Sequence, residues 1–130
     1  MAFYVDSSAI LKLTFTEPES VLLREWLTQD QPMLVGSDLV RTETIRAVRR
    51  MVPDHVDRAL TTLGLLNLLR VTPTAFRRAA ELGPESLRSL DALHLACALE
   101  LGEELEGMIT YDSRLTVACA RHGVPVAAPA

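Results

Sequence analysis

Several kinds of residue are scarce in this sequence, and each shortage excludes a class of protein. No apolar run is long enough to cross a membrane, and Asp6 and Lys12 interrupt the N-terminal apolar stretch, which argues against a signal peptide. The two cysteines, Cys97 and Cys119, lack metal-site spacing and fit reduced core residues of a cytoplasmic protein. With a net charge of −4, the chain as a whole is not built to bind a polyanion, so nucleic-acid contacts require a local basic patch.

Length and hydrophobic content indicate one domain with apolar surface to spare. At 130 residues the chain predicts a single domain over residues 1–130, large enough for a hydrophobic core. The hydrophobic share of 48% and the mean hydropathy of +0.18 are high for so small a chain. We therefore expect apolar surface that is left for a partner chain.

Short apolar segments alternate with helical patterns along the whole chain. The segments typical of strands are 2–5, 33–35, 68–71, 108–111 and 124–127. The helical patterns between them are 7–13, 21–27, 39–52, 54–67, 76–82, 85–101 and 113–121. This alternation predicts a three-layer α/β/α fold with a short central parallel sheet.

Two aspartates come directly after predicted strands. Asp6 follows the first strand, and Asp112 follows the strand 108–111. In open parallel α/β sheets, ligands bind at the carboxyl ends of the strands, which makes both carboxylates candidates for a binding site. Aspartate is also a preferred helix cap, so each residue could serve only to begin the next helix.

Two further acidic residues lie within predicted helices. A helical wheel places Asp91 on the most apolar face of helix 85–101, where an ionised group costs several kcal/mol unless it is paired or bound to a metal. A buried pair with His94, or with an arginine from elsewhere, would also satisfy it. Glu43 lies three residues before Arg46, a spacing that is equally typical of a surface ion pair.

Four converging carboxylates without a countercharge would repel one another, and a hard divalent cation with oxygen ligands, Mg²⁺ or Mn²⁺, is the usual solution. The three histidines are scattered and make no zinc site. Acidic residues that hold two cations are typical of enzymes that attack phosphodiesters. Two alternatives remain: a non-catalytic RNA- or protein-binding module with a structural cation, and a phosphoaspartate hydrolase, although Ser8 stands where that chemistry usually has a second aspartate.

Five features of the sequence occur together: YVDSSAILKL at 4–13, Glu43 in the third helix, LDALHLA at 90–96, TYDSRL at 110–115 and GVPV at 123–126. In these features the sequence resembles PIN-domain proteins, in particular the VapC toxins of bacterial toxin–antitoxin pairs. The resemblance implies a PIN-like nuclease domain with Mg²⁺- or Mn²⁺-dependent endoribonuclease activity on RNA. It also implies inhibition by a cognate antitoxin protein and a homodimer, which the apolar residues on nearly all sides of helix 85–101 favour independently.

The resemblance also assigns roles to the acidic residues. Asp6, Glu43, Asp91 and Asp112 correspond to the acidic quartet of the family, the first three holding one cation and Asp112 completing a second or outer-sphere site. The metal-activated water makes a histidine base unnecessary. The sequence further offers five candidates for contacts with water or with RNA phosphates: Arg46, Arg50, Thr110, Ser113 and Arg114.

Overall fold

A five-stranded parallel sheet with strand order β3-β2-β1-β4-β5 forms the centre of the computed structural model, which describes residues 1–130. The strands are β1 Ala2–Val5, β2 Met33–Ser37, β3 Asn67–Leu69, β4 Leu105–Ile109 and β5 Val126–Ala127. The prediction of a three-layer fold with a short parallel sheet is confirmed. Since β1 pairs with both β2 and β4, the first strand of the chain is also the middle strand of the sheet.

Seven α-helices connect the strands, with two short 3₁₀ turns, Pro53–His55 and Gly102–Glu104. The helices are α1 Ser7–Thr14, α2 Ser20–Asp30, α3 Asp38–Met51, α4 Val56–Leu63, α5 Pro73–Glu81, α6 Ser89–Leu99 and α7 Ser113–Arg121. None of them is long and apolar enough to span a membrane.

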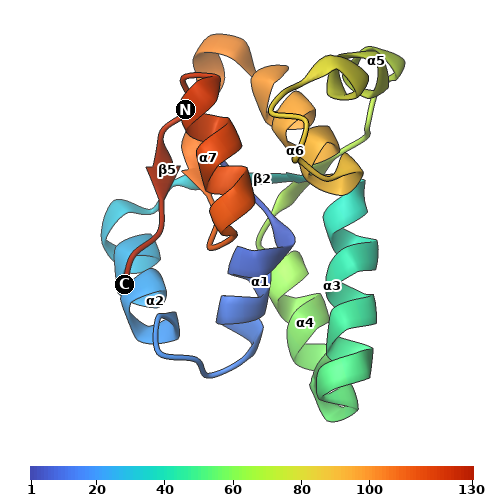
Figure 1. Cartoon of the computed structure of the whole chain (residues 1–130). Helices are drawn as coiled ribbons and strands as arrows, with labels where there is room; N and C mark the ends of the chain where they lie inside the picture. The colour runs from blue at the N-terminus through green and yellow to red at the C-terminus, as the bar shows by residue number, and fades with distance from the viewer.

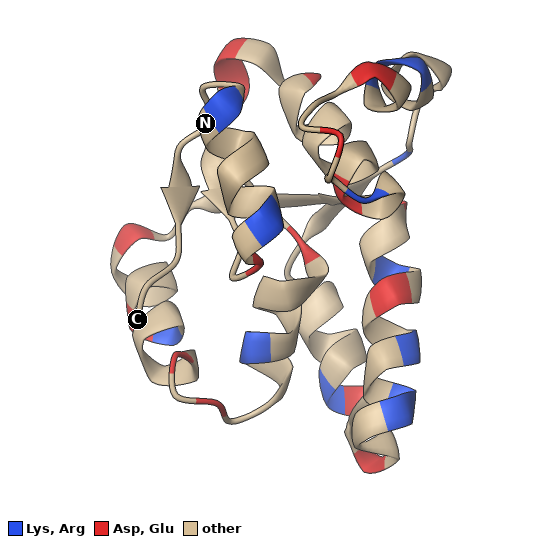
Figure 2. Ribbon diagram, viewed as in Figure 1, with Lys and Arg blue, Asp and Glu red and all other residues tan.

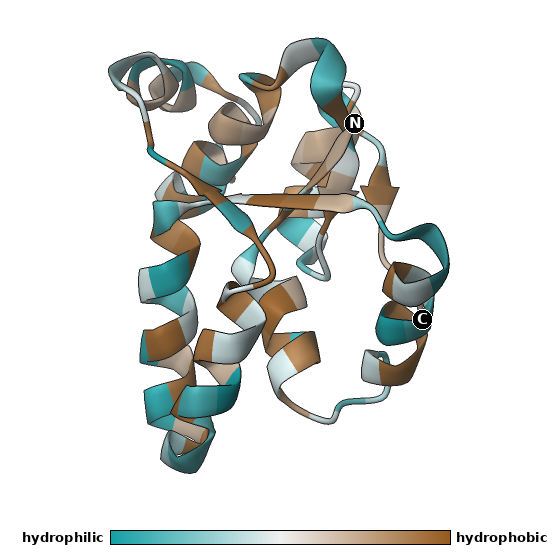
Figure 3. Cartoon of the chain, turned by 180° about the vertical axis from the view of Figure 1, so that it is seen from behind, coloured by the Kyte–Doolittle hydropathy of each residue, from teal (hydrophilic) through white to brown (hydrophobic).

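The two faces of the sheet are covered by different groups of helices (Figure 1). Tyr4 and Met108 belong to a core that also contains residues of α5, α6 and α7, whereas Val5 and Ile109 belong to a second core with residues of α1 to α4. Alternate strand residues therefore face opposite layers, as the pleat of a strand requires. Basic residues recur along α3 (Figure 2), while the strands are largely apolar (Figure 3).

A glycine in β4, Gly107, lets neighbouring segments of the same chain approach closely. A Cβ atom on Gly107 would lie 2.8 Å from the carbonyl oxygen of Pro125 and 2.9 Å from the ring of Phe3. The ring of Phe3 in turn packs edge-on against Trp26 of α2, with the ring centroids 5.0 Å apart. Only a residue without a side chain fits between these groups.

The largest differences from the predicted boundaries concern two helices. Helix 85–101 was expected to begin at Glu85, but α6 begins at Ser89, because residues 84–87 form a turn in which the N–H of Leu87 donates to the carbonyl of Pro84. The expected helix 54–67 is a 3₁₀ turn followed by α4, which ends at Leu63. Asn67 then already pairs with Val35 of β2, so β3 begins one residue earlier than predicted.

Candidate metal and catalytic centre

The candidate site lies where the carboxyl ends of β1 and β4 meet. The chain leaves β1 toward β2 on one side and later returns to β4 on the other, so this seam is the switch point of the sheet, where such folds bind ligands. The N–H of Asp6 donates to the carbonyl of Ile109 at 3.3 Å, which ties the two strand ends together. Asp6 and Asp112, far apart in sequence, are both positioned by these two strands.

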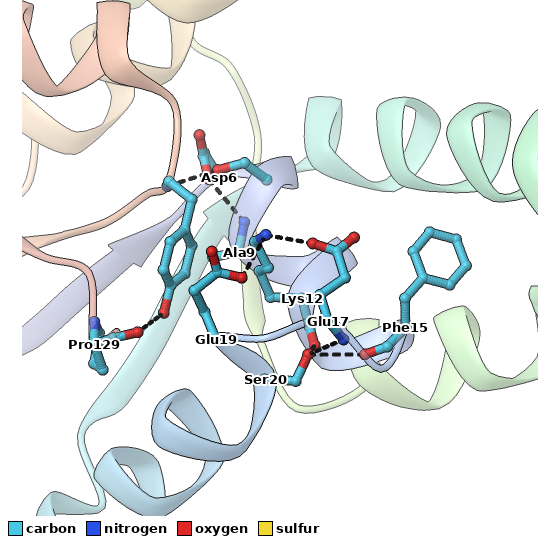
Figure 4. Close-up of polar contacts among 10 residues, drawn as sticks. Asp6, Ala9, Lys12, Phe15, Glu17, Glu19, Ser20 and Pro129 are labelled. Atoms are coloured by element: carbon cyan, nitrogen blue, oxygen red, sulfur yellow. Dashed lines mark hydrogen bonds and ion pairs between the residues drawn. The ribbon is translucent and has the colours of Figure 1, made fainter.

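Asp6 is buried and its carboxylate accepts three hydrogen bonds. Its Oδ1 accepts from the hydroxyl of Ser8 at 2.7 Å and from the N–H of Ala9 at 3.2 Å, and its Oδ2 accepts from the hydroxyl of Thr110 at 2.7 Å. Figure 4 shows the bond to Ala9, which caps α1. Burial raises the pKa of Asp6, and these hydrogen bonds oppose the rise. Asp6 therefore both caps a helix and lies in the acidic cluster.

Asp112 caps α7 in the same way as Asp6 caps α1. Its Oδ1 accepts from the N–H of Leu115 at 2.8 Å and caps α7. Its own N–H donates to the hydroxyl oxygen of Thr110 at 3.1 Å, and the same hydroxyl donates to Asp6. The buried Thr110 thus links the two aspartates and is oriented toward them.

The pKa of Asp91 is affected by all three of the other carboxylates. Its pKa is raised to about 6, first by burial and then by the charges of Asp112, Asp6 and Glu43, while His94 lowers it. No hydrogen bond contributes to this shift, and the structure gives Asp91 no ion-pair partner. The structure thus brings all four sequence-predicted carboxylates within electrostatic reach of one another.

Glu43 contacts a different partner from the one its spacing predicted. It makes no ion pair with Arg46; instead its Oε1 contacts Nε2 of the buried His94. His94 is also hydrogen-bonded through Nδ1 to the hydroxyl of Tyr4 at 2.7 Å, and it makes no direct bond with Asp91. Sequence reasoning missed the roles of Tyr4 and Ser8, although both lie within two residues of Asp6.

Two hollows flank the cluster. The larger, of about 480 Å³, lies between α1, α3 and the start of α6 and is lined in part by Glu43, Arg46 and Arg50. The smaller, of about 150 Å³, has no hydrophobic lining residue. It is lined by two carboxylates, two arginines and one serine: Asp91, Asp112, Arg88, Arg114 and Ser113.

The arginine at 88 was not among the sequence candidates. It precedes the first turn of α6, and neither it nor Arg114 makes an ion pair within the chain, although both line the hollow with Asp91 and Asp112. In the sequence, the only feature that could have indicated a role for Arg88 is its position three residues, or one helical turn, before Asp91.

The donor set fits a hard cation in its chemistry. All four candidate ligands are carboxylates, which Mg²⁺ and Mn²⁺ prefer. Their mutual repulsion, which adds to the effect of burial in raising the pKa of Asp91, is what a bound divalent cation would relieve. The side chains are not drawn together around one point, since no three acidic, histidine or cysteine side chains form a ready metal-binding group. Metal binding would therefore involve a rearrangement of side chains.

Comparison with known proteins identifies the family of the chain. Residues 3–120 match the PIN domain. Two proteins of Mycobacterium tuberculosis are similar along their whole length: Ribonuclease VapC47, 40% identical over 97% of this chain and 96% of its own, and Ribonuclease VapC46, 42% identical over 98% of each.

Solved structures share the fold. The M. tuberculosis toxin VapC20, described as cleaving the sarcin–ricin loop, has a TM-score of 0.75 and 15% identity, over 90% of this chain and 95% of its own. A toxin–antitoxin complex from Klebsiella pneumoniae has a TM-score of 0.72 and 22% identity, over 99% and 98%. From the family match and the full-length relatives together, the chain belongs to the PIN-domain family and is of the VapC type.

Proposed function

We propose that this protein is a divalent-metal-dependent endoribonuclease and the toxin of a VapBC-type toxin–antitoxin pair. The observation that carries the proposal is the convergence of four carboxylates at the switch point, where three of them raise the pKa of the fourth, Asp91. The full-length relatives named Ribonuclease VapC support the reaction class.

We assign Asp6, Glu43 and Asp91 to a first Mg²⁺ or Mn²⁺ ion and Asp112 to a second or outer-sphere site. Activation of water and neutralisation of charge on the phosphate are the chemistry that the metal supplies when bound. Ser8 and Thr110 hold the buried Asp6 by hydrogen bonds, and Thr110 also holds the backbone of Asp112. The bonds to Asp6 fix the orientation of its carboxylate before any metal binds, which reduces the cost of ordering this one ligand.

The RNA strand is assigned to the two hollows on either side of the cluster. Arg46 and Arg50 line the larger hollow beside Glu43, and Arg88 and Arg114 line the smaller one with Ser113. All four arginines are exposed, and a guanidinium matches the geometry of a phosphate. An RNA backbone that crosses the carboxylates would thus meet arginine side chains on both sides. These arginines supply the local positive charge that the protein, with its net negative charge, lacks as a whole.

The proposed partners are a cognate antitoxin and a second copy of the chain. One structural neighbour is a toxin–antitoxin complex, which supports the first. Exposed apolar side chains, with Phe76 of α5 at 54% and Leu90 of α6 at 45% exposure, supply surface for a protein partner.

The test is cleavage of end-labelled RNA by the purified protein in EDTA, in Mg²⁺ and in Mn²⁺. We expect cleavage only with a divalent cation, restored by adding excess metal after EDTA. Asp91→Asn should abolish it, while the matched surface variant Glu106→Gln should cleave like the wild type, since Glu106 is exposed on β4 away from the cluster.

Cleavage that continues unchanged in excess EDTA, with a contaminating nuclease excluded, would contradict the proposal. RNA binding without cleavage in any metal would favour the alternative of a binding module with a structural cation. Sedimentation of the purified protein, alone and mixed with a candidate antitoxin, tests the two partners.

A further inference from the structure

His94 is enclosed in the core yet uses both ring nitrogens on side chains of two other elements. It lies on α6, one turn after Asp91, and is 1% exposed. Its Nδ1 lies 2.7 Å from the hydroxyl of Tyr4 on β1, and its Nε2 contacts Oε1 of Glu43 on α3. The rings of Tyr4 and His94 also meet edge to face, with centroids 5.7 Å apart. Three elements that surround the acidic cluster are thus joined through one imidazole.

The direction of these bonds follows from the chemistry of the groups. An ionised carboxylate has no proton to give, so Nε2 of His94 is the donor to Glu43. In the tautomer that carries its proton on Nε2, Nδ1 of His94 accepts the hydrogen bond from the hydroxyl of Tyr4. The chain of donors therefore runs from Tyr4 through His94 and ends on the carboxylate of Glu43.

This arrangement acts on the one glutamate among the four carboxylates. Glutamate has one more rotatable bond than aspartate, and the side chain of Glu43 remains 21% exposed, whereas Asp6 is buried and held by three hydrogen bonds. A bond from the immobile His94 to Oε1 limits the positions of Glu43 and leaves Oε2 for another partner.

We propose that Tyr4 and His94 are positioning residues which hold Glu43 in the conformation that binds the divalent cation. The inference rests on the proposed metal site and adds two residues outside the acidic quartet to it. Hydrogen-bonding partners of metal ligands commonly change metal affinity by 10–100-fold when they are removed. If the two residues only joined α3 and α6 to the sheet, their loss would lower stability and leave metal affinity unchanged.

The experiment measures Mn²⁺ affinity directly, by the loss of the free Mn²⁺ EPR signal on titration, alongside thermal unfolding in EDTA. We expect His94→Leu to weaken Mn²⁺ binding about 10-fold or more, and Tyr4→Phe to weaken it by a smaller factor. His94→Gln places an amide donor near the position of Nε2 and should recover part of the loss. In RNA cleavage, the variants should need more Mn²⁺ for half-maximal rate and approach the wild-type rate at saturating metal.

Tyr111→Phe is the matched control. It removes a tyrosine hydroxyl that also makes a 2.7 Å hydrogen bond, to the carbonyl of Pro129, away from the carboxylates. Its Mn²⁺ affinity should equal that of the wild type.

The inference is overturned if Tyr4→Phe and His94→Leu bind Mn²⁺ like the wild type, or if the wild type binds no Mn²⁺. Should His94→Leu fail to fold, Tyr4→Phe alone decides, since it removes a single oxygen from the core. A wild type that binds Mn²⁺ but cleaves no RNA would refute the nuclease proposal, while the affinities of the variants would still support or overturn the positioning role.

Discussion

Replacing Asp91 by asparagine should stabilise the metal-free protein at neutral pH. The folded-state pKa of Asp91, about 6, lies above its ordinary value of 3.8. The contribution of Asp91 to the free energy of unfolding is therefore fully present below pH 4, where its carboxyl group is protonated. This contribution is lost as the pH rises through about 6. Asparagine has no charge to desolvate or repel, so the variant avoids that loss.

The expected size of the effect follows from the same pKa. The difference between 3.8 and about 6 corresponds to roughly 3 kcal/mol. Because Asp91 is only half-buried and solvent screens its charge, we expect a measured gain of about 1–2 kcal/mol at pH 7. For a chain of this length, that corresponds to a rise in melting temperature of roughly 3–8 °C.

The assay is thermal unfolding of the wild type and Asp91→Asn in EDTA at pH 4 and pH 7, repeated with Mn²⁺. The two proteins should differ at pH 7 and nearly coincide at pH 4, and Mn²⁺ should stabilise only the wild type. A structural role for Asp91 as a buried partner predicts the opposite: a loss of about 3 kcal/mol or more in EDTA. That loss, combined with unchanged stabilisation by Mn²⁺, would refute the metal-ligand assignment.

Three further predictions concern other parts of the chain. Asp6→Asn keeps a side chain that can cap α1, and Asp6→Ala does not. In urea unfolding, the free energy of unfolding of Asp6→Ala should therefore be about 1 kcal/mol lower than that of Asp6→Asn. Equal values would contradict the capping role. Gly107→Ala places a methyl group 2.8 Å from the oxygen of Pro125 and should cost about 1–3 kcal/mol, and an unchanged melting temperature would contradict this. Burial raises the pKa of the Cys97 and Cys119 thiols to about 11 and about 12, so both should react with a disulfide reagent at pH 7.5 only after unfolding. Rapid labelling of either cysteine in the native protein would contradict this prediction.

The sequence was most informative where one local signal carried both structure and chemistry. An apolar strand followed by an aspartate located Asp6 and Asp112, and each aspartate proved to cap a helix as well as to line the site. For Asp91, the helical wheel identified a carboxylate on the most apolar face of its helix, and in the structure the residue is half-buried, with a raised pKa.

What the sequence could not supply was pairing between distant elements. Local spacing placed Glu43 beside Arg46, and the wheel placed His94 beside Asp91, yet the contact that forms joins Glu43 to His94 across 51 residues. Tyr4 was assigned only to a strand, because nothing local shows that its hydroxyl meets an imidazole 90 residues away. Such contacts depend on how helices cross the sheet, which hydrophobic periodicity does not specify.

The pairing of β1 with β4 also has a consequence for biosynthesis. The first strand completes its hydrogen bonds only when residues 105–109 arrive beside it, and the last quartet member, Asp112, follows that strand. Contacts between residues so distant in sequence form late and slowly in folding. A nascent chain, or one truncated before residue 112, has no assembled acidic cluster, so the proposed activity begins only after residue 112 has emerged from the ribosome.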